Sequence, residues 1–267
     1  MDMGAESNPL LDLSARPVIA HRGASGAAPE NTRAAFELAV RQGADAFELD
    51  VRLTADGVPV VFHDPTLQRT TDRAGLLGSL RLADLKDIDA GFRFSPDGGR
   101  TFPFRAGGVR IPTLTEVLRG FPDMPVLLEL KEAAAQGPVR QLLIEENAVD
   151  RCVLASEHLA ALKVFREPPF ATAASAAEIG VLYRAVLFRR VPISLPYRLL
   201  SVPVRHRGLP VPTRSFVAAA RGLGCPVHVW TVNDAATART LWGRGVAGMV
   251  TNLPDLIGEA RKQEARE

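Results

Sequence analysis

Eight short apolar runs that alternate with helical stretches predict an α/β protein, a (β/α)₈ TIM barrel. The length of 267 residues fits this fold, because a barrel of this kind needs roughly 250 residues. Charged residues also gather near the ends of several of these runs, where a parallel barrel carries its active site. We therefore expect one domain over residues 17–262, preceded by a flexible lead-in over residues 1–16.

The expected strands are short and rich in Val, Leu, Ile and Ala. The core strands are predicted at residues 17–20, 45–54, 125–131, 151–156, 170–174, 199–204, 226–232 and 248–251, with an extra short strand at 59–62. The expected helices lie at residues 32–42, 138–147, 158–166, 176–189, 215–223, 235–244 and 253–262.

The stretch from about 69 to 111 interrupts this alternation. It is too long for a simple strand-to-helix loop and is rich in Gly, Pro, Phe and Arg. We expect a small insertion after the second strand, with one short helix near residues 82–88. Insertions of this kind often shape a substrate site.

The composition is that of an ordinary globular protein, with 46% hydrophobic and 23% charged residues. No run approaches the ~18 apolar residues of a membrane-spanning helix. The polar start lacks the pattern of a secretory signal, and Cys152 and Cys225 lie in apolar strand-like runs. We expect two buried free thiols, a cytoplasmic location and, from the net charge of +2, no strong nucleic-acid binding.

The charge is unevenly distributed along the chain. Residues 179–233 hold eight Arg and no Asp or Glu, which leaves −6 for the rest of a chain of net charge +2. Within this stretch, residues 181–200 combine four Arg with large apolar side chains and both tyrosines. Such a segment is typical of a peripheral contact with an anionic membrane, and also of an outer barrel helix with solvated Arg side chains.

Carboxylates occur at alternate positions near the ends of two core strands. The side-chain period of two puts Glu48 and Asp50 on one face, and likewise Glu129 and Lys131. Three converging carboxylates repel one another, and a divalent cation is the simplest way to hold them together. Oxygen ligands favour Mg²⁺ or Ca²⁺ over zinc. The alternative is a set of salt bridges with Arg22, Arg52 and Lys131.

Two histidines follow apolar strands, so both are expected to point into the same barrel mouth. His21 ends the first strand and His63 ends the short extra strand. A His pair suits general acid and general base catalysis, and the fork of Arg22 suits a phosphate oxygen. With a metal site and Lys131, this set predicts hydrolysis of a phosphate ester. Which His is the acid and which the base stays open.

The chain resembles a known enzyme family. Over about residues 17–258 it is similar to the glycerophosphodiester phosphodiesterases, TIM-barrel enzymes of the phosphatidylinositol phospholipase C-like superfamily. The motifs that carry the resemblance are His21-Arg22-Gly23, Pro29-Glu30-Asn31-Thr32, Gly43-Ala44-Asp45, Glu48-Leu49-Asp50-Val51, Thr54-Ala55-Asp56-Gly57, Val60-Val61-Phe62-His63-Asp64, Arg69-Thr70-Thr71-Asp72, Ile111-Pro112-Thr113-Leu114, Leu128-Glu129-Leu130-Lys131, Val229-Trp230-Thr231-Val232-Asn233 and the region 248–254.

The resemblance implies a role for each matching residue. His21 and His63 correspond to the catalytic acid/base pair. Glu48, Asp50 and Glu129 correspond to the ligands of the Mg²⁺ or Ca²⁺ ion, and Arg22 and Lys131 to the phosphate-binding cations. Trp230 resembles an aromatic residue that contacts substrate, although plain packing explains it equally well. Asn31 is expected to cap the first helix, and Glu30 to support the metal site indirectly.

Two motifs depart from the family pattern. The chain has Ser156-Glu157-His158 where members often have Ser-Phe, and Gly245-Val246-Ala247-Gly248 with Thr251-Asn252 where Asp residues are usual. We expect neither departure to touch the catalytic set.

The resemblance leaves the substrate open between two classes. One is a soluble glycerophosphodiester, cleaved to glycerol phosphate and an alcohol. The other is a membrane-derived lysophospholipid, cleaved as by a lysophospholipase D, with residues 181–200 at the inner membrane surface and the Phe-rich insertion beside an acyl chain. An idle phosphate- or lipid-binding barrel is a third reading, disfavoured by the intact His pair. The head group, the metal ion and the oligomeric state stay open.

Overall fold

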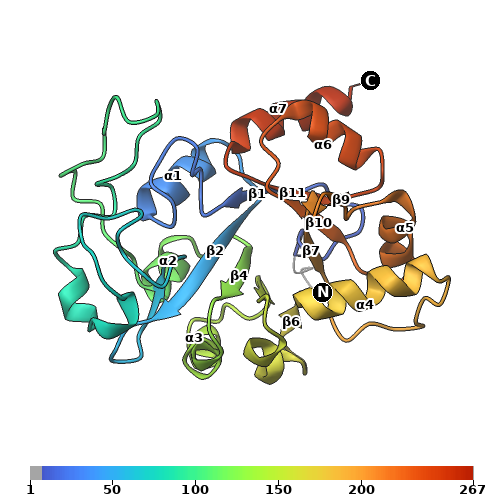
Figure 1. Cartoon of the computed structure of the whole chain (residues 1–267), viewed down its shortest axis with the longest axis horizontal. Helices are drawn as coiled ribbons and strands as arrows, with labels where there is room; N and C mark the ends of the chain where they lie inside the picture. The colour runs from blue at the N-terminus through green and yellow to red at the C-terminus, as the bar shows by residue number, and fades with distance from the viewer. Residues whose placement is uncertain (1–7, 267) are drawn as a thin grey trace, which may run out of the picture.

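The computed structural model describes residues 8–266. Its eight parallel strands are β1 (Val18–His21), β2 (Ala46–Leu53), β4 (Val126–Leu130), β5 (Cys152–Ala155), β6 (Ala171–Thr172), β7 (Leu200–Pro203), β10 (Val227–Trp230) and β11 (Gly248–Thr251). They pair in the order β6-β5-β4-β2-β1-β11-β10-β7. A parallel bridge between Ala173 and Leu199 joins the two ends of this order into a ring, which confirms the (β/α)₈ prediction (Figure 1).

The helices lie outside the ring, and five of the seven described begin at a Ser, Thr or Asp cap. They are α1 (Arg33–Arg41), α2 (Leu114–Gly120), α3 (Gln136–Glu145), α4 (Ala176–Leu187), α5 (Arg214–Gly222), α6 (Ala235–Trp242) and α7 (Pro254–Glu264). The sequence analysis missed α2, although Thr113 and Glu116 form a capping box at its start. The helix expected at 158–166 is a 3₁₀ helix, Leu159–Phe165.

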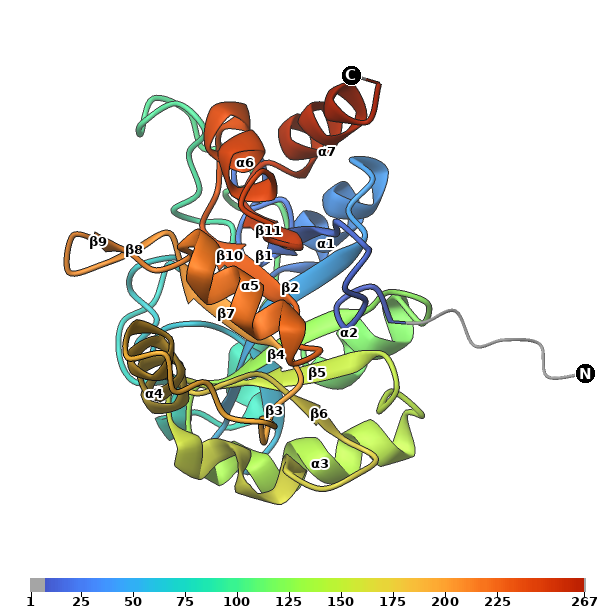
Figure 2. The same ribbon diagram turned by 90° about the vertical axis from the view of Figure 1, so that its right-hand side faces the viewer.

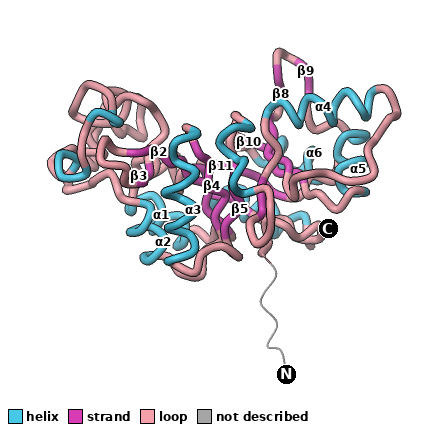
Figure 3. Tube along the Cα trace, turned by 90° about the horizontal axis from the view of Figure 1, so that it is seen from below, coloured by secondary structure: helices cyan, strands magenta, loops and turns pink. Residues whose placement is uncertain are grey.

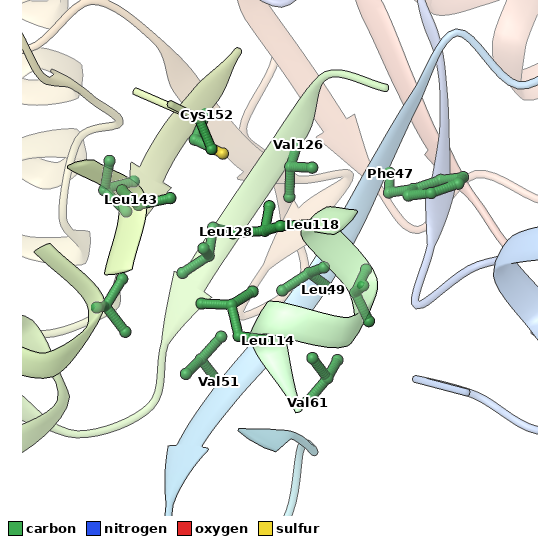
Figure 4. Packing of buried hydrophobic residues seen from close by; sticks show 14 of the residues in the cluster. Phe47, Leu49, Val51, Val61, Leu114, Leu118, Val126, Leu128, Leu143 and Cys152 are labelled. Carbon is green, nitrogen blue, oxygen red and sulfur yellow. The ribbon is translucent and has the colours of Figure 1, made fainter. Parts of the chain in front are cut away.

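Side chains of the strands alternate between the inside of the barrel and the helices. Phe47, Leu49 and Val51 of β2 face outward and pack with α2 and with strand neighbours in the large outer core (Figure 4). Ala46, Glu48 and Asp50 therefore face the barrel interior. An inner cluster of Leu10, Ile19, Ala46, Leu127, Val153, Ala171, Ala173, Leu199 and Val250 fills the lower half of the barrel. The upper half is left for polar groups.

Part of the expected lead-in, residues 8–16, packs against the barrel. Residues 1–7 lie outside the described part of the chain, but Leu10 is fully buried in the inner cluster. The carbonyl of Leu10 accepts a hydrogen bond from His228 Nε2 at 2.9 Å, and Gly248 N–H donates to His228 Nδ1 at 2.9 Å. The expected flexible lead-in is therefore corrected for residues 8–16, which close the end of the barrel opposite the active site. In Figure 2 the first described residues, drawn in dark blue, lie to the right of the barrel strands, while α4 lies to the left.

The insertion contains its own small core. β3 (Pro59–Val61) pairs antiparallel with β2, and the 3₁₀ helices Leu77–Ser79 and Leu82–Leu85 follow it. The second of these replaces the helix expected near 82–88. Five residues of the insertion join three that precede it in a separate buried cluster: Leu77, Leu85, Ile88, Ala90 and Ile111 with Val60, Phe62 and Leu67. The insertion is thus a packed unit over one side of the barrel mouth, and Phe94 and Phe104 pack edge to face within it.

A two-stranded hairpin was not expected from the sequence. β8 (Arg205–His206) and β9 (Leu209–Pro210) pair antiparallel between β7 and α5. The tight turn uses Arg207 and Gly208, both with positive φ. The hairpin extends from the body of the protein on the same end as the insertion (Figure 3). None of the described helices is long and apolar enough to cross a membrane.

The buried His228 leads to a testable prediction about acid stability. Burial lowers its pKa to about 4, from an ordinary value of 6.5, because the neutral ring alone fits between Leu10 and Gly248. Its contribution is complete above about pH 6.5 and is lost as the pH falls towards 4, by up to about 3 kcal/mol. Urea unfolding at about pH 7 and about pH 5 measures it.

The variant His228→Gln is expected to lose this part of the pH dependence while being less stable at neutral pH. His158→Gln is the control, because His158 is exposed. Equal pH dependence of wild type and His228→Gln would contradict the prediction.

Candidate active site

The polar side chains of β1, β2 and β4 meet inside the barrel mouth. His21 lies opposite Glu48 in the strand register, and Asp50 lies opposite Glu129. The sequence analysis placed the β2 pair at the end of its strand, but β2 continues to Leu53. Asp50 is consequently fully buried, with 0% exposure, and Glu48 is nearly so at 6%. Both carboxylates need compensating charges at this depth.

Two cations compensate Asp50. Lys131 Nζ lies 2.8 Å from Asp50 Oδ1 and 2.9 Å from Glu129 Oε2, and Arg22 Nε lies 3.1 Å from Asp50 Oδ2. Burial alone would raise the pKa of Asp50, but the charges of Arg22 and Lys131 outweigh it and lower the pKa. Part of the salt-bridge alternative is therefore present. The third expected cation, Arg52, instead donates to the carbonyl of His63 at 2.7 Å.

The two cations leave the carboxylate cluster under-compensated. Burial raises the pKa of Glu48 well above its usual range, and the nearby charge of Asp50 adds to the rise. Burial also raises the pKa of Glu129, although Lys131 opposes this. Within residues 8–266, Asp50 Oδ1 has no partner in hydrogen-bond geometry, although Lys131 Nζ is close.

This donor set fits a divalent cation. Glu48, Asp50 and Glu129 each offer an oxygen, and these oxygens lie within 4.8 Å of one another. Three carboxylates and two cations leave one net negative charge in a buried site, and hard oxygen ligands are the preference of Mg²⁺ and Ca²⁺. The chain's own residues thus provide a possible metal site where the sequence predicted one.

His21 is held by a residue that the sequence analysis treated as remote. Asn252 Oδ1 lies 2.7 Å from His21 Nδ1, which leaves Nε2 directed at Glu48, 3.9 Å from its Oε2. The expectation that the Thr251-Asn252 departure leaves the catalytic set untouched is wrong. Burial and the charge of Arg22 lower the pKa of His21. The available signal was that Asn252 directly follows β11, the strand beside β1.

His63 is held by a carboxylate instead. Its Nδ1 lies 2.5 Å from Asp64 Oδ1. Arg69 binds the same carboxylate and also Glu30, and Glu30 in turn binds Arg22 at 2.9 Å. Burial would raise the pKa of Asp64, but the bonds from Arg69 and His63 lower it to about 2. An ionic chain therefore runs from His63 to Arg22 across the mouth.

Asn31 has a different role from the one expected. Thr32, not Asn31, caps α1, since its side chain accepts from Ala35 N–H. Asn31 has a positive φ of 57° and donates through Nδ2 to Asp50 Oδ2 at 2.8 Å. It therefore orients a carboxylate of the possible metal site. Glu30 supports the site through Arg22, as anticipated.

A cavity of about 730 Å³ opens above these groups. His21, His63, Glu48, Glu129, Arg22 and Lys131 line one end of it. Trp230 also lines it and is 38% exposed, so this side chain is not simply packed in the core. The other end is lined mainly by apolar residues of α4 and the hairpin, including Ile179, Tyr183, Leu209 and Pro210. The cavity thus has a polar end and an apolar end.

A barrel that gathers two histidines, three carboxylates, Arg22 and Lys131 at its mouth has the groups of a phosphoric diester hydrolase. The chain matches the model of the glycerophosphoryl diester phosphodiesterase family over residues 21–256. It is 35% identical to a glycerophosphodiester phosphodiesterase of Caldanaerobacter subterraneus, over 92% of this chain and 98% of that protein. It is 36% identical to YhdW of Bacillus subtilis, with the same two coverages.

Solved structures of phosphodiesterases are similar to this chain as well. A phosphodiesterase of Oleispira antarctica, in complex with the product sn-glycerol-3-phosphate, is 30% identical and covers 93% of this chain and 97% of its own, with a TM-score of 0.74. A glycerophosphoryl diester phosphodiesterase domain of a Mycobacterium tuberculosis protein has a TM-score of 0.83 at 22% identity, over 94% of this chain and all of that domain, and supports the fold. The chain belongs to the glycerophosphodiester phosphodiesterase family and is a phosphoric diester hydrolase.

The carboxylate cluster gives a second prediction. In protein stripped with EDTA, added Mg²⁺ or Ca²⁺ is expected to raise the melting temperature, because a bound cation relieves the repulsion at Glu48. Glu129→Gln removes one ligand of three, and we expect cation affinity to fall about 10- to 100-fold. Thermal unfolding against cation concentration measures both.

Glu157→Gln is the matched control, since Glu157 lines the same cavity outside the carboxylate cluster. If the cation still raised the melting temperature of Glu129→Gln but not that of Glu157→Gln, the cation would bind outside the carboxylate cluster.

Proposed function

We propose that this enzyme cleaves glycerophosphodiesters to glycerol phosphate and an alcohol at the polar end of the cavity. The observation that carries the proposal is the meeting of the His pair with the carboxylate cluster and two cations in one buried mouth. The product complex of the Oleispira relative, with sn-glycerol-3-phosphate, supports the same product class here.

In this proposal Glu48, Asp50 and Glu129 hold Mg²⁺ or Ca²⁺. When bound, such an ion supplies positive charge for phosphate oxygens and favours deprotonation of a nearby hydroxyl. Arg22 and Lys131 flank the carboxylates and line the cavity, so both cations are placed to bind phosphate oxygens as charge builds up on them. Trp230 offers an apolar face to the alcohol portion.

The partners of the two histidines favour different roles. The Asp64 carboxylate contacts His63 Nδ1 and places a negative charge beside this ring, which favours the general-acid role. Asn252 is a neutral amide that holds one tautomer of His21, with the free Nε2 towards Glu48. We assign His21 to remove the proton of the attacking oxygen. His63 then protonates the alcohol oxygen as its bond to phosphorus breaks.

A lysophospholipid is the second candidate substrate. The apolar end of the cavity favours this substrate, because glycerol phosphate has no apolar group that would contact Ile179, Leu209 and Pro210. Cleavage would follow the lysophospholipase D pattern with the same catalytic groups. The expected peripheral contact of residues 181–200 with the inner membrane surface belongs to this candidate.

A cytoplasmic location is part of the proposal. Both cysteines, Cys152 and Cys225, are buried and free, as expected for a reducing compartment. Burial raises the pKa of each thiol to about 12, so both are inert.

The acid and base roles are separable with two substrates. His63→Ala is expected to slow hydrolysis of glycerophosphocholine about 10²- to 10⁴-fold, but to matter little for a diester with a p-nitrophenol leaving group, which needs no protonation. His21→Ala is expected to slow both substrates. Initial rates with saturating metal measure this, and circular dichroism checks the fold.

Loss of p-nitrophenol release in His63→Ala with retention in His21→Ala would reverse the two roles. Equal rates of wild type and His21→Ala on both substrates would remove the acid/base pair from the mechanism.

The substrate class is tested by giving the protein glycerophosphocholine and lysophosphatidylcholine in parallel, each with Mg²⁺, Ca²⁺ or EDTA. Choline and the phosphorylated product are the readouts. We expect metal-dependent turnover of glycerophosphocholine. Turnover of the lysolipid alone would select the second candidate, and turnover of neither would count against the choline head group in both.

A further inference from the structure

One exposed surface combines apolar and cationic side chains beside the cavity. We define the α4–hairpin surface as residues 181–193 and 205–210, at the upper right in Figure 3. Large apolar side chains are unusually exposed there: Ile193 at 98%, Phe188 at 69% and Leu209 at 66%. Val181, Leu187 and Val191 on the same surface are exposed as well. Clustered exposure of this kind marks a contact surface rather than a scatter of single residues.

The helix that supplies most of this surface is only partly covered by the rest of the protein. α4 has twelve residues, and Leu182 is its one buried side chain. Its neighbour α5, with nine residues, buries three. Tyr183 reaches the hairpin, where its hydroxyl donates to the carbonyl of Pro210 at 3.3 Å. Ile179, Tyr183 and Val186 are partly buried against the outer core, whereas Val181 and Leu187 are exposed to solvent.

The same surface carries positive charge only. Arg184, Arg189, Arg190, Arg205 and Arg207 are all exposed. Within residues 8–266 none of the five forms an ion pair, whereas Arg residues elsewhere do. The nearest acidic residues in sequence are Glu178 and Asp234. The unmatched charge selects for an anionic partner.

The geometry points to an anionic lipid surface, and we propose that the α4–hairpin surface docks on it. A second copy of the chain would bring five Arg against five Arg in a two-fold contact, which like-charge repulsion opposes. An anionic bilayer accepts both features, since Arg side chains meet lipid phosphates while Phe188 and Ile193 enter the acyl boundary.

Docking there places the cavity against the lipid. Tyr183 and Arg184 of α4 and His206, Leu209 and Pro210 of the hairpin belong to this surface and also line the cavity. A diester with an apolar group would pass from the bilayer along this end towards His21 and His63. In this respect the inference rests on the proposed function, whereas the docking itself does not.

The test is co-sedimentation of the full chain with vesicles of phosphatidylcholine, with and without phosphatidylglycerol, at low and high salt. We expect binding only to the anionic vesicles, and weaker binding at high salt. Two variants are compared: the charge variant Arg189→Gln/Arg190→Gln/Arg207→Gln and the apolar variant Phe188→Ser/Ile193→Ser. Each is expected to weaken vesicle binding at least tenfold.

Matched controls lie elsewhere on the surface. Arg41→Gln and Ile144→Ser alter an exposed Arg and an exposed apolar residue away from the α4–hairpin surface, and are expected to bind as wild type. Hydrolysis of glycerophosphocholine in vesicle-free buffer is expected to stay unchanged in all four proteins. This assay reports on the proposed function separately, because its failure in wild type leaves vesicle binding measurable.

The docking proposal is overturned by any of three results. The first is that wild type fails to bind anionic vesicles. The second is that both variants bind these vesicles as tightly as wild type. The third is that wild type binds vesicles of phosphatidylcholine alone equally well. Concentration-dependent dimers that vanish in the apolar variant would instead make the surface a contact between copies.

Discussion

The arrangement of the barrel mouth depends on one constraint: three carboxylates share a buried space with too little positive charge. Arg22 and Lys131 compensate the charge of Asp50 and Asn31 donates to it, while Glu48 and Glu129 are left with raised pKa values. The backbone and side-chain contacts around the mouth compensate this excess of negative charge. Arg22 has a positive φ of 58°, which brings its backbone N–H onto Glu48 and its guanidinium between Glu30 and Asp50. Such strain persists only where neighbours over-determine it, and here the carboxylates of Glu30, Glu48 and Asp50 all contact Arg22.

The same constraint explains why the sequence was informative about this site. Alternation along β2 and β4 requires Glu48, Asp50, Glu129 and Lys131 to face inward once Leu49, Val51 and Leu130 face the helices. Inward charge in a strand needs either a ligand or buried salt bridges, and both explanations predict a polar mouth. The contacts that orient His21 and Asp50 were not predicted, for a physical reason. Asn252 and His21 are separated by nearly the whole chain, and only ring closure of β11 on β1 brings them together. Asn31 was misjudged because a capping residue and a carboxylate-orienting residue have the same local pattern.

Elements outside the alternation were the hardest to predict. The hairpin of β8 and β9 has strands of two residues, too short to show a period, and its exposure removes the burial pattern that identifies a strand. The lead-in looked like a terminus because Leu10, Leu11 and Leu13 form too short an apolar run, among polar residues, to show a period. Its burial depends on an opening at the bottom of the barrel and on the carbonyl acceptor that His228 needs. Both are properties of the closed ring, not of the local sequence.

The two halves of the chain divide the work of the enzyme. Every residue of the His pair, the carboxylate cluster and the phosphate-binding cations lies between His21 and Lys131. The later half contributes Asn252 as a support and otherwise builds access: α4, the hairpin and Trp230 surround the apolar end of the cavity. Charge follows this division, since residues 179–233 carry no acid at all. Segregation keeps the Arg residues of the α4–hairpin surface from pairing with the carboxylates that the mouth needs. It also leaves the two regions free to serve different partners, a phosphate inside and an anionic surface outside.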